Sequence, residues 1–393
     1  MRVTKTILIV SLFIFNLFTV NKSIATENVE VRNIYIKAEK LLWQPESLAF
    51  KELYNQLHYY PLQPYLDQQI LIRHMSLSKV GEIDAFLKKY QGSPLGIPLR
   101  KKWLTYLAKL NKSKLFLEYY QPTENARLRC FYYRYQLLSG LSESLILPQV
   151  TKLWTVGKSQ DEACDPLFQQ WEKAGYQTNE NVWQRIKLAA DGGKHTLIPY
   201  LTKKLPEKEW YLGQLWKKVR GDPSHINRLS RFPKRSEKES EIIVYGLKRL
   251  IWRDPNLAIK TYEKALKVFD FSKQQKSFIT SRFAIALTSK NHKQSKYWLD
   301  QVEMHSLTKK MVELRLTQLI KKQDWNTLVV ELPNLPDRYK DALQWRYWFA
   351  RALIENKEMT RGENILKLLS TERHYYGFLA ASTLNLPVNL QHK

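Results

Sequence analysis

The chain has 393 residues and a formal net charge of +26 at pH 7, from 63 basic and 37 acidic side chains. It contains two cysteines, Cys130 and Cys164, and neither has the spacing of a zinc or redox motif, which excludes those classes of site. A basic chain in the cytoplasm would suggest nucleic acid as a partner, whereas an exported one suggests anionic envelope material. The cellular compartment therefore decides how the charge is interpreted.

Residues 1–25 have the three parts of a secretory signal peptide. Basic Arg2 and Lys5 precede the apolar run Ile7–Val20, and Ser23-Ile24-Ala25 supplies a small-residue cleavage site. The run is shorter than the roughly 20 residues that span a bilayer, and no second run of spanning length follows in the sequence. An uncleaved anchor is the alternative. We expect export as a soluble protein, without nucleic acid as a partner, and cleavage would lower the charge from +26 to +23.

The part from residue 26 to 239 is predicted to be helical with irregular periods. Prolines divide it into shorter helices, at Pro61, Pro64, Pro94, Pro98, Pro122 and Pro148. Its last part, residues 203–238, is the densest basic stretch of the chain. An anionic partner is one interpretation of this stretch, and the solvated helix faces of a Lys-rich protein are the other.

The two cysteines favour a structural disulfide, because an exported chain matures in an oxidising compartment. A Cys130–Cys164 bridge would close a loop of about 35 residues and could stabilise the fold by roughly 3–4 kcal/mol. Two free buried thiols are the alternative.

Helical periodicity becomes regular from residue 240. The clearest helix is Ser240–Arg253, preceded by Ser236-Glu-Lys-Glu239, which fits a capping box. Its expected inward face is Ile243, Leu247, Leu250 and Ile251. Asp254-Pro255 then predicts an N-cap and first turn, followed by inward Ala258, Ile259, Tyr262, Ala265 and Leu266. Ser272-Lys-Gln-Gln275 caps the next helix, which is expected to bury Phe278, Ile279, Phe283, Ala286 and Leu287.

These helices are predicted to form hairpins with periods of roughly 32–36 residues. The predicted pairs are 254–268 with 272–289, 292–301 with 306–322, 324–332 with 338–356, and 359–369 with 374–384. Such repeats bury their apolar faces by stacking on their neighbours. The fold class is therefore all-α, a degenerate tetratricopeptide-like superhelical solenoid. It consists of the irregular part 26–239, regular repeats over 240–387 and a tail 388–393.

Five segments occur in the order and spacing of a known family, together with the cysteine pair. They are Tyr60–Asp67, Val80–Tyr90, Leu99–Ala108, Leu153–Asp165 with Phe168 and Trp171, and Tyr375–Ala380. Over about residues 27–387 the chain resembles the N-terminal superhelical domain of the soluble lytic murein transglycosylases of the Gram-negative periplasm. The resemblance implies a ring-shaped helical domain that helps to hold glycan strands, and a periplasmic location. The family reaction is non-hydrolytic cleavage of the MurNAc–GlcNAc bond, giving 1,6-anhydro products.

The catalytic motif of that family is missing from these 393 residues. The family acid is a Glu in a Glu-Ser pair, followed by Gly-Leu-Met-Gln and then Ala-Tyr-Asn. Glu-Ser occurs at Glu46, Glu143 and Glu239, and Gly-Leu-Met-Gln follows none of them. We therefore assign no catalytic residue, and we expect the chain alone to be inactive. A truncated or split gene with a separate catalytic domain as partner is one explanation, and an array that acts alone in peptidoglycan binding or scaffolding is the other.

Other chemistry is not indicated either. Zinc-protease, serine-hydrolase and phosphate-loop motifs are absent from the sequence, so we predict no cofactor and no metal site. His374 is expected to pack at a helix start rather than to bind a ligand. Trp345, Tyr347, Trp348 and Phe349 crowd one helix and must partly face outward, where such rings can stack on sugars. The predicted function is a peptidoglycan-associated superhelical domain, and the alternative is an envelope adaptor that binds proteins rather than glycan.

Overall fold

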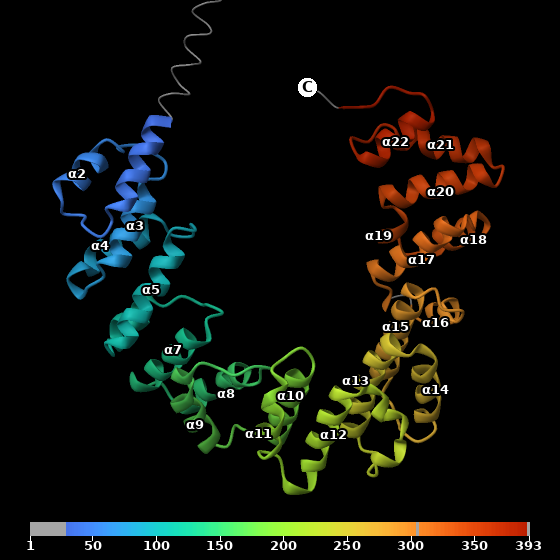
Figure 1. Ribbon diagram of the computed structural model, residues 1–393, viewed down its shortest axis with the longest axis horizontal. Coiled ribbons are helices and arrows are strands. Elements are labelled where there is room, and N and C mark those ends of the chain that lie inside the picture. Colours follow the sequence, from blue (N-terminus) through green and yellow to red (C-terminus); the bar gives the residue numbers. More distant parts are fainter. Residues whose placement is uncertain (1–28, 304–305, 391–393) are drawn as a thin grey trace, which may run out of the picture. The chain divides into compact units, whose positions relative to one another are not determined.

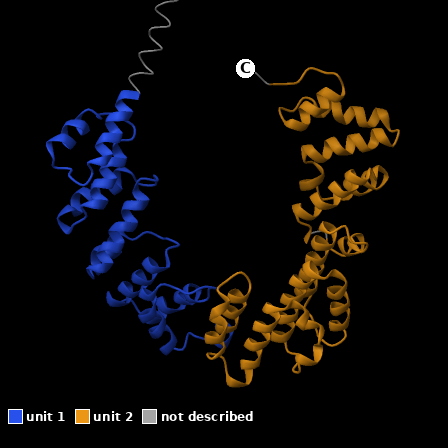
Figure 2. Ribbon diagram, in the orientation of Figure 1, with its two compact units in different colours: residues 1–181 blue, residues 182–393 orange. Residues whose placement is uncertain are grey.

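The computed structural model describes residues 29–303 and 306–390, and these form two compact units that divide between Asn181 and Val182 (Figures 1 and 2). The described residues contain helices and no strand, which confirms the predicted all-α class. No described helix is both long and apolar enough to cross a membrane. The predicted signal peptide, residues 1–25, lies outside the described residues. The 239/240 division and the ring shape stay predictions.

Unit 1 is a run of short helices. After a helix over residues 29–40 come α2 (Leu48–Asn55), α3 (Gln63–Arg73), α4 (Val80–Lys89), α5 (Gly96–Lys109), α6 (Ser113–Tyr119), α7 (Ala126–Leu138), α8 (Glu143–Trp154) and α9 (Asp165–Lys173). One buried cluster of this unit lies where α3 to α7 meet, around Trp103 and Phe116. Three of the six prolines lie within helices rather than between them: Pro64 and Pro98 in the first turns of α3 and α5, and Pro148 inside α8.

Unit 2 begins within α10 (Asn179–Ala190), whose first three residues precede the division. It contains α11 (Ile198–Thr202), α12 (Trp210–Gly221), α13 (Glu237–Arg253), α14 (Pro255–Ala265), α15 (Lys273–Ser289), α16 (Ser295–Asp300), α17 (Lys309–Lys322), α18 (Trp325–Glu331), α19 (Asp337–Lys340), α20 (Leu343–Glu355), α21 (Met359–Leu369) and α22 (Tyr375–Thr383). Between α12 and α13 lie the short 3-10 helices η5 (Pro223–Asn227) and η6 (Leu229–Arg231).

The predicted caps are found, with one change. Asp254 caps α14 through the N–H of Leu257, and Ser272 and Gln275 form a complete capping box on α15. Ser236 caps α13 by accepting from the N–H of Glu239. The predicted return bond from Glu239 to Ser236 is wrong, because Glu239 Oε1 instead accepts from the N–H of Lys234 at 3.2 Å.

The predicted hairpins are confirmed in part. The predicted partners α18 and α20 pack on each other, and so do α21 and α22. The other two predicted pairs are wrong, because α14 packs on α13 and α16 packs on α15. The single residue Asp254 separates α13 from α14, and so short a connection makes antiparallel neighbours. The predicted helix 338–356 is also divided, into α19 and α20.

Two residues of the predicted core are on the surface. Phe278 is 37% exposed and Leu266 is 42% exposed, whereas the other predicted inward residues of α13, α14 and α15 are buried. The Arg282 guanidinium lies 4.9 Å from the centroid of the Phe278 ring, one turn along the same helix. This contact covers one face of an exposed ring.

Candidate functional site

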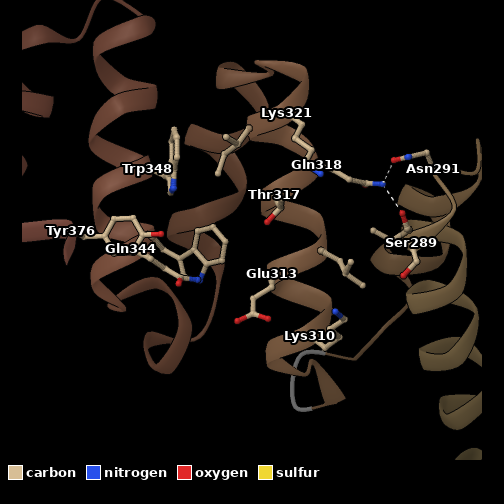
Figure 3. A pocket seen from close by; sticks show the side chains of 14 residues that line it. Ser289, Asn291, Lys310, Glu313, Thr317, Gln318, Lys321, Gln344, Trp348 and Tyr376 are labelled. Atoms are coloured by element: carbon tan, nitrogen blue, oxygen red, sulfur yellow. Dashed lines mark hydrogen bonds between the residues drawn. The ribbon is translucent and has the colours of Figure 1, made fainter. Parts of the chain in front are cut away.

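The α17–α20 cleft is a cavity of about 550 Å³ on unit 2 (Figure 3). It is formed by the end of α15 and by α17, α20 and α22. Its lining residues are Thr288, Ser289, Asn291, Lys310, Glu313, Leu314, Thr317, Gln318, Ile320, Lys321, Gln344, Trp345, Trp348 and Tyr376. The lining thus combines aromatic rings with hydroxyl, amide and charged groups.

The amphipathic pattern of α17 turns its polar side toward the cleft. Thr308 caps the helix by accepting from the N–H of Met311, and the helix ends at Gln323 in the left-handed conformation. Met311, Val312, Leu316 and Leu319 are buried on the other side. Because residues three and four apart share a helix face, Lys310, Glu313, Thr317 and Lys321 form one polar stripe along the cleft.

Gln318 fastens α17 to the end of α15. Its Nε2 donates to the backbone oxygen of Thr288 at 2.6 Å and to Oδ1 of Asn291 at 2.7 Å. In Figure 3 this side chain points away from Trp348 and Tyr376, toward Asn291. Both N–H donors of the amide are used by these bonds. Gln318 therefore holds α17 against the end of α15 and does not leave its amide N–H groups free for a ligand.

The opposite wall is aromatic. Trp348 of α20 and Tyr376 of α22 are half-buried, and with Gln344 they lie across from Glu313 and Thr317 of α17 (Figure 3). Trp345 is buried and belongs to the apolar cluster beneath. The ring centroid of Tyr347 lies 5.6 Å from that of Trp348 and 5.7 Å from that of Tyr376. Both cleft rings are thus supported by a buried neighbour, so that they are held in place before a ligand arrives.

His374 supports the same wall from behind. As the N-cap of α22 it accepts a hydrogen bond from the N–H of Tyr376 at 3.3 Å, and its ring stacks on Tyr376 with a centroid separation of 5.9 Å. His374 therefore packs at a helix start, as predicted, and it also caps α22.

The chemistry of the lining suits a polar ring that has an apolar face, because aromatic faces lie beside hydroxyls and amides. Among the lining residues Glu313 is the one carboxylate, and Lys309 lies 3.7 Å from it across one helical turn.

The Glu residues of the three Glu-Ser pairs have different local surroundings. Glu46 is exposed and pairs with Lys51 at 2.8 Å, whose hydrogen bond lowers the pKa of the carboxyl group. Glu143 accepts from Nε2 of Gln170 at 2.7 Å on the surface. Glu239 is fully buried in the first turn of α13. None of the three lines the cleft.

Cys130 of α7 and Cys164 are both fully buried, and the structure joins their sulfur atoms at 1.97 Å. Arg127, in the same turn of α7 as Cys130, lies 3.2 Å from Asp161, which caps the short helix that contains Cys164. The two cysteines therefore connect α7 to the segment before α9 within unit 1. No group of three or more His, Cys, Asp or Glu side chains within the described residues is placed to hold a metal ion.

Sequence reasoning identified the aromatic residues of α20 but missed most of the cleft. Thr317, Gln344 and Tyr376 belong to three helices and become neighbours only through the packing of α17, α20 and α22. The usable signal was the polar stripe on α17, with its spacing of three and four residues beside a buried apolar face.

Comparisons with known proteins agree with this architecture. No family model matches the chain. The soluble lytic murein transglycosylase of Salmonella typhimurium is 23% identical over 359 residues, which cover 90% of this chain and 55% of the relative. A structure of an inactive mutant of the lytic transglycosylase Slt from Pseudomonas aeruginosa has a TM-score of 0.78 and 29% identity, and covers 92% of this chain and 59% of that one.

A structure of the 70 kDa soluble lytic transglycosylase of Escherichia coli has a TM-score of 0.74 with 22% identity, and it shows the shared helical fold. The chain spans a little more than half the length of these proteins. Over about nine-tenths of its own length, the chain resembles the soluble lytic murein transglycosylase family.

Proposed function

We propose that the protein is a periplasmic, peptidoglycan-associated helical domain, and that the α17–α20 cleft binds the glycan strand. The similarity to murein transglycosylases supports the substrate class. The observation that carries the proposal is the placement of Trp348 and Tyr376 across from the polar stripe of α17, with Gln344 beside them (Figure 3).

This arrangement suits an N-acetylated sugar. The apolar face of a pyranose ring stacks on the Trp348 indole, and Tyr376 covers its edge. Thr317 and Gln344 offer a hydroxyl and an amide for the sugar hydroxyls and the acetamido group. The rings are supported by Tyr347 and the α17 wall is braced by Gln318, so little ordering is needed on binding.

The charged ends of the polar stripe suit the peptide that peptidoglycan carries. Lys310 and Lys321 lie at opposite ends of the stripe and can attract stem-peptide carboxylates. Glu313, between them, can accept a hydrogen bond from a peptide amine. A glycan with its stem peptide is therefore expected to bind more tightly than the bare glycan.

We also propose that these 393 residues cleave no glycosidic bond alone. The support is that none of Glu46, Glu143 and Glu239 lines the cleft. Full-length chain purified from the periplasm should release no 1,6-anhydro-muropeptides from sacculi, as followed by mass spectrometry. Their release would overturn this part of the proposal and leave the binding part to be judged separately.

The binding test uses a GlcNAc–MurNAc tetrasaccharide, with and without stem peptides, titrated calorimetrically into the exported protein. Trp348→Ala should weaken binding at least about tenfold, corresponding to about 1.4 kcal/mol. Trp252→Ala is the matched control, because Trp252 is 45% exposed on α13 and does not line the cleft.

Equal loss in both tryptophan variants, or binding abolished by modest salt without glycan competition, would contradict the cleft assignment. Capture of envelope proteins with no glycan binding would instead favour the adaptor function.

A further inference from the structure

The basic stretch 203–238 has more cations than its four acids can neutralise, and two of these acids are already paired. Asp222 accepts from the hydroxyl of Ser224 at 2.7 Å and lies 3.1 Å from Arg253. Glu209 pairs with Lys238 at 2.6 Å. The positive side chains that remain are therefore not screened by these two carboxylates.

Three of the remaining cations meet at one cavity, the α12–η6 pocket, of about 270 Å³. It is lined by Tyr211, Gln214, Leu215 and Lys218 of α12, by Arg231 at the end of η6, and by Pro233 and Lys234. Within the described part of the chain, no carboxylate forms an ion pair with Lys218, Arg231 or Lys234. Such a concentration of like charge is unfavourable until an anion binds.

The segment that carries Arg231 and Lys234 is fixed on the fold. Glu239, fully buried behind it, accepts from the N–H of Lys234 at 3.2 Å. Arg231 Nη1 donates to Nδ1 of His225 at 2.5 Å, and Arg235 Nη1 donates to the backbone oxygen of Leu229 at 2.6 Å. The cations of the pocket therefore project from an anchored backbone.

The charge and volume of the pocket limit the chemical class of ligand that it can bind. With Glu239 counted against the three cations, the formal charge around the pocket is +2, which matches a dianion. Arg231 supplies the planar fork that recognises oxyanions, and two lysines supply point charges. The volume of 270 Å³ is about nine times the share of one water molecule in the liquid, so the pocket holds more than a bare oxyanion.

We propose that the α12–η6 pocket binds an organic phosphate monoester, with the phosphate between Lys218, Arg231 and Lys234. The organic part lies against the apolar side formed by Leu215, Pro233 and the Tyr211 ring. Gln214 is positioned to hydrogen-bond a hydroxyl of that part. This site uses none of the residues of the α17–α20 cleft, and the inference does not depend on the proposed function.

The test is calorimetric titration of glucose 6-phosphate into the full chain purified after export, at two salt concentrations. Inorganic phosphate, glucose and succinate are titrated for comparison. We expect glucose 6-phosphate to bind more tightly than phosphate or succinate, and glucose alone to give no heat. Succinate binding as tightly as glucose 6-phosphate would overturn the assignment to a phosphate.

The variant Lys218→Gln/Lys234→Gln removes two exposed cations of the pocket and should weaken binding of glucose 6-phosphate at least about tenfold. The matched control is Lys203→Gln/Lys217→Gln, which removes two exposed cations from the same stretch outside the pocket. It should change the affinity less than about twofold. Equal losses in the two variants would show non-specific attraction and overturn the site.

The variant Arg231→Lys tests whether the guanidinium group itself, and not only its positive charge, contributes to phosphate binding. It keeps the positive charge and loses the planar fork, so binding should still weaken several-fold. Unchanged affinity in this variant would remove Arg231 from the site. Circular dichroism of each variant checks that the helical fold is retained.

Discussion

Arg315 of α17 and Glu331 of α18 form a two-point ion pair, with Nε 2.9 Å from Oε2 and Nη2 2.6 Å from Oε1. The Arg315 side chain is 14% exposed, and its hydrogen bond to Glu331 raises the pKa of the guanidinium. This pair joins α18 to α17, the helix that forms one wall of the cleft.

Arg315→Met should destabilise unit 2, because it leaves the Glu331 carboxylate, which is 26% exposed, with Lys296 at 3.9 Å in place of the two-point pair. We expect a loss of about 2 kcal/mol, between the values for surface and buried pairs, measured by urea unfolding. Lys88→Gln breaks an exposed pair with Asp84 on α4 and should leave the unfolding midpoint unchanged. If the two substitutions lowered the free energy of unfolding equally, the Arg315–Glu331 pair would stabilise no more than an exposed pair.

Gly377 allows α22 to approach the preceding turn. A Cβ at this position would lie 2.1 Å from the backbone oxygen of Glu372 and 3.0 Å from that of Leu369. Because backbone atoms cannot rotate away, Gly377→Ala should destabilise by about 1–3 kcal/mol. Gly81→Ala is the control, since nothing lies within 4 Å of its Cβ position on α4. A melting curve for Gly377→Ala that matches that of Gly81→Ala would contradict the predicted clash.

The disulfide prediction is tested by removing both cysteines. Cys130→Ala/Cys164→Ala leaves no unpaired thiol and should cost roughly 3–4 kcal/mol, because the unfolded chain gains the freedom of the opened loop. The melting temperature of the protein purified under oxidising conditions should fall by several degrees. The Cα atoms lie 5.0 Å apart, a separation that a bridge spans. An unchanged melting temperature would mean that the thiols do not pair in the isolated protein.

The helices of the regular repeats could be predicted because caps and apolar spacing are local signals. Asp254 and Ser272 begin helices where the sequence places them, and Met359–Leu369 has the predicted bounds. Partner choice was predicted only in part. The pairs α18 with α20 and α21 with α22 were predicted, whereas α14 packs on α13 rather than on α15. Each helix of a solenoid contacts neighbours on both sides, and the one-residue connection between α13 and α14 decides their pairing.

The errors at single residues have the same origin. Phe278 and Leu266 fit an apolar spacing but are exposed, and Leu266 is the C-cap residue, one position beyond the last residue of α14. Glu239 matches a capping box, but the bend that brings Lys234 close offers its carboxylate another donor. The cleft and the α12–η6 pocket are each lined by residues that are distant in the sequence. Local sequence patterns therefore do not predict either cavity.

His225 provides a prediction on pH. Burial is the largest cause that lowers its pKa, followed by the positive charges of Arg231, Lys218 and Arg228, with Asp222 opposing. A His whose pKa is lower in the folded state is protonated more readily after unfolding, so the folded state loses stability as the pH falls through the ordinary His pKa of about 6.5. His225→Gln removes this contribution and keeps a side chain that can accept from Arg231.

The melting temperature should therefore drop more for the unsubstituted protein than for His225→Gln between pH 7.5 and pH 5.5. His58→Gln is the control, because the His58 ring belongs to unit 1 and contacts exposed Tyr59, whereas the basic cluster around His225 belongs to unit 2. Parallel pH profiles of the unsubstituted protein and His225→Gln would show that His225 titrates alike in the folded and unfolded states. Glucose 6-phosphate should reduce the pH dependence of the unsubstituted protein, because a dianion between Lys218 and Arg231 offsets the positive charge that holds the His225 pKa down.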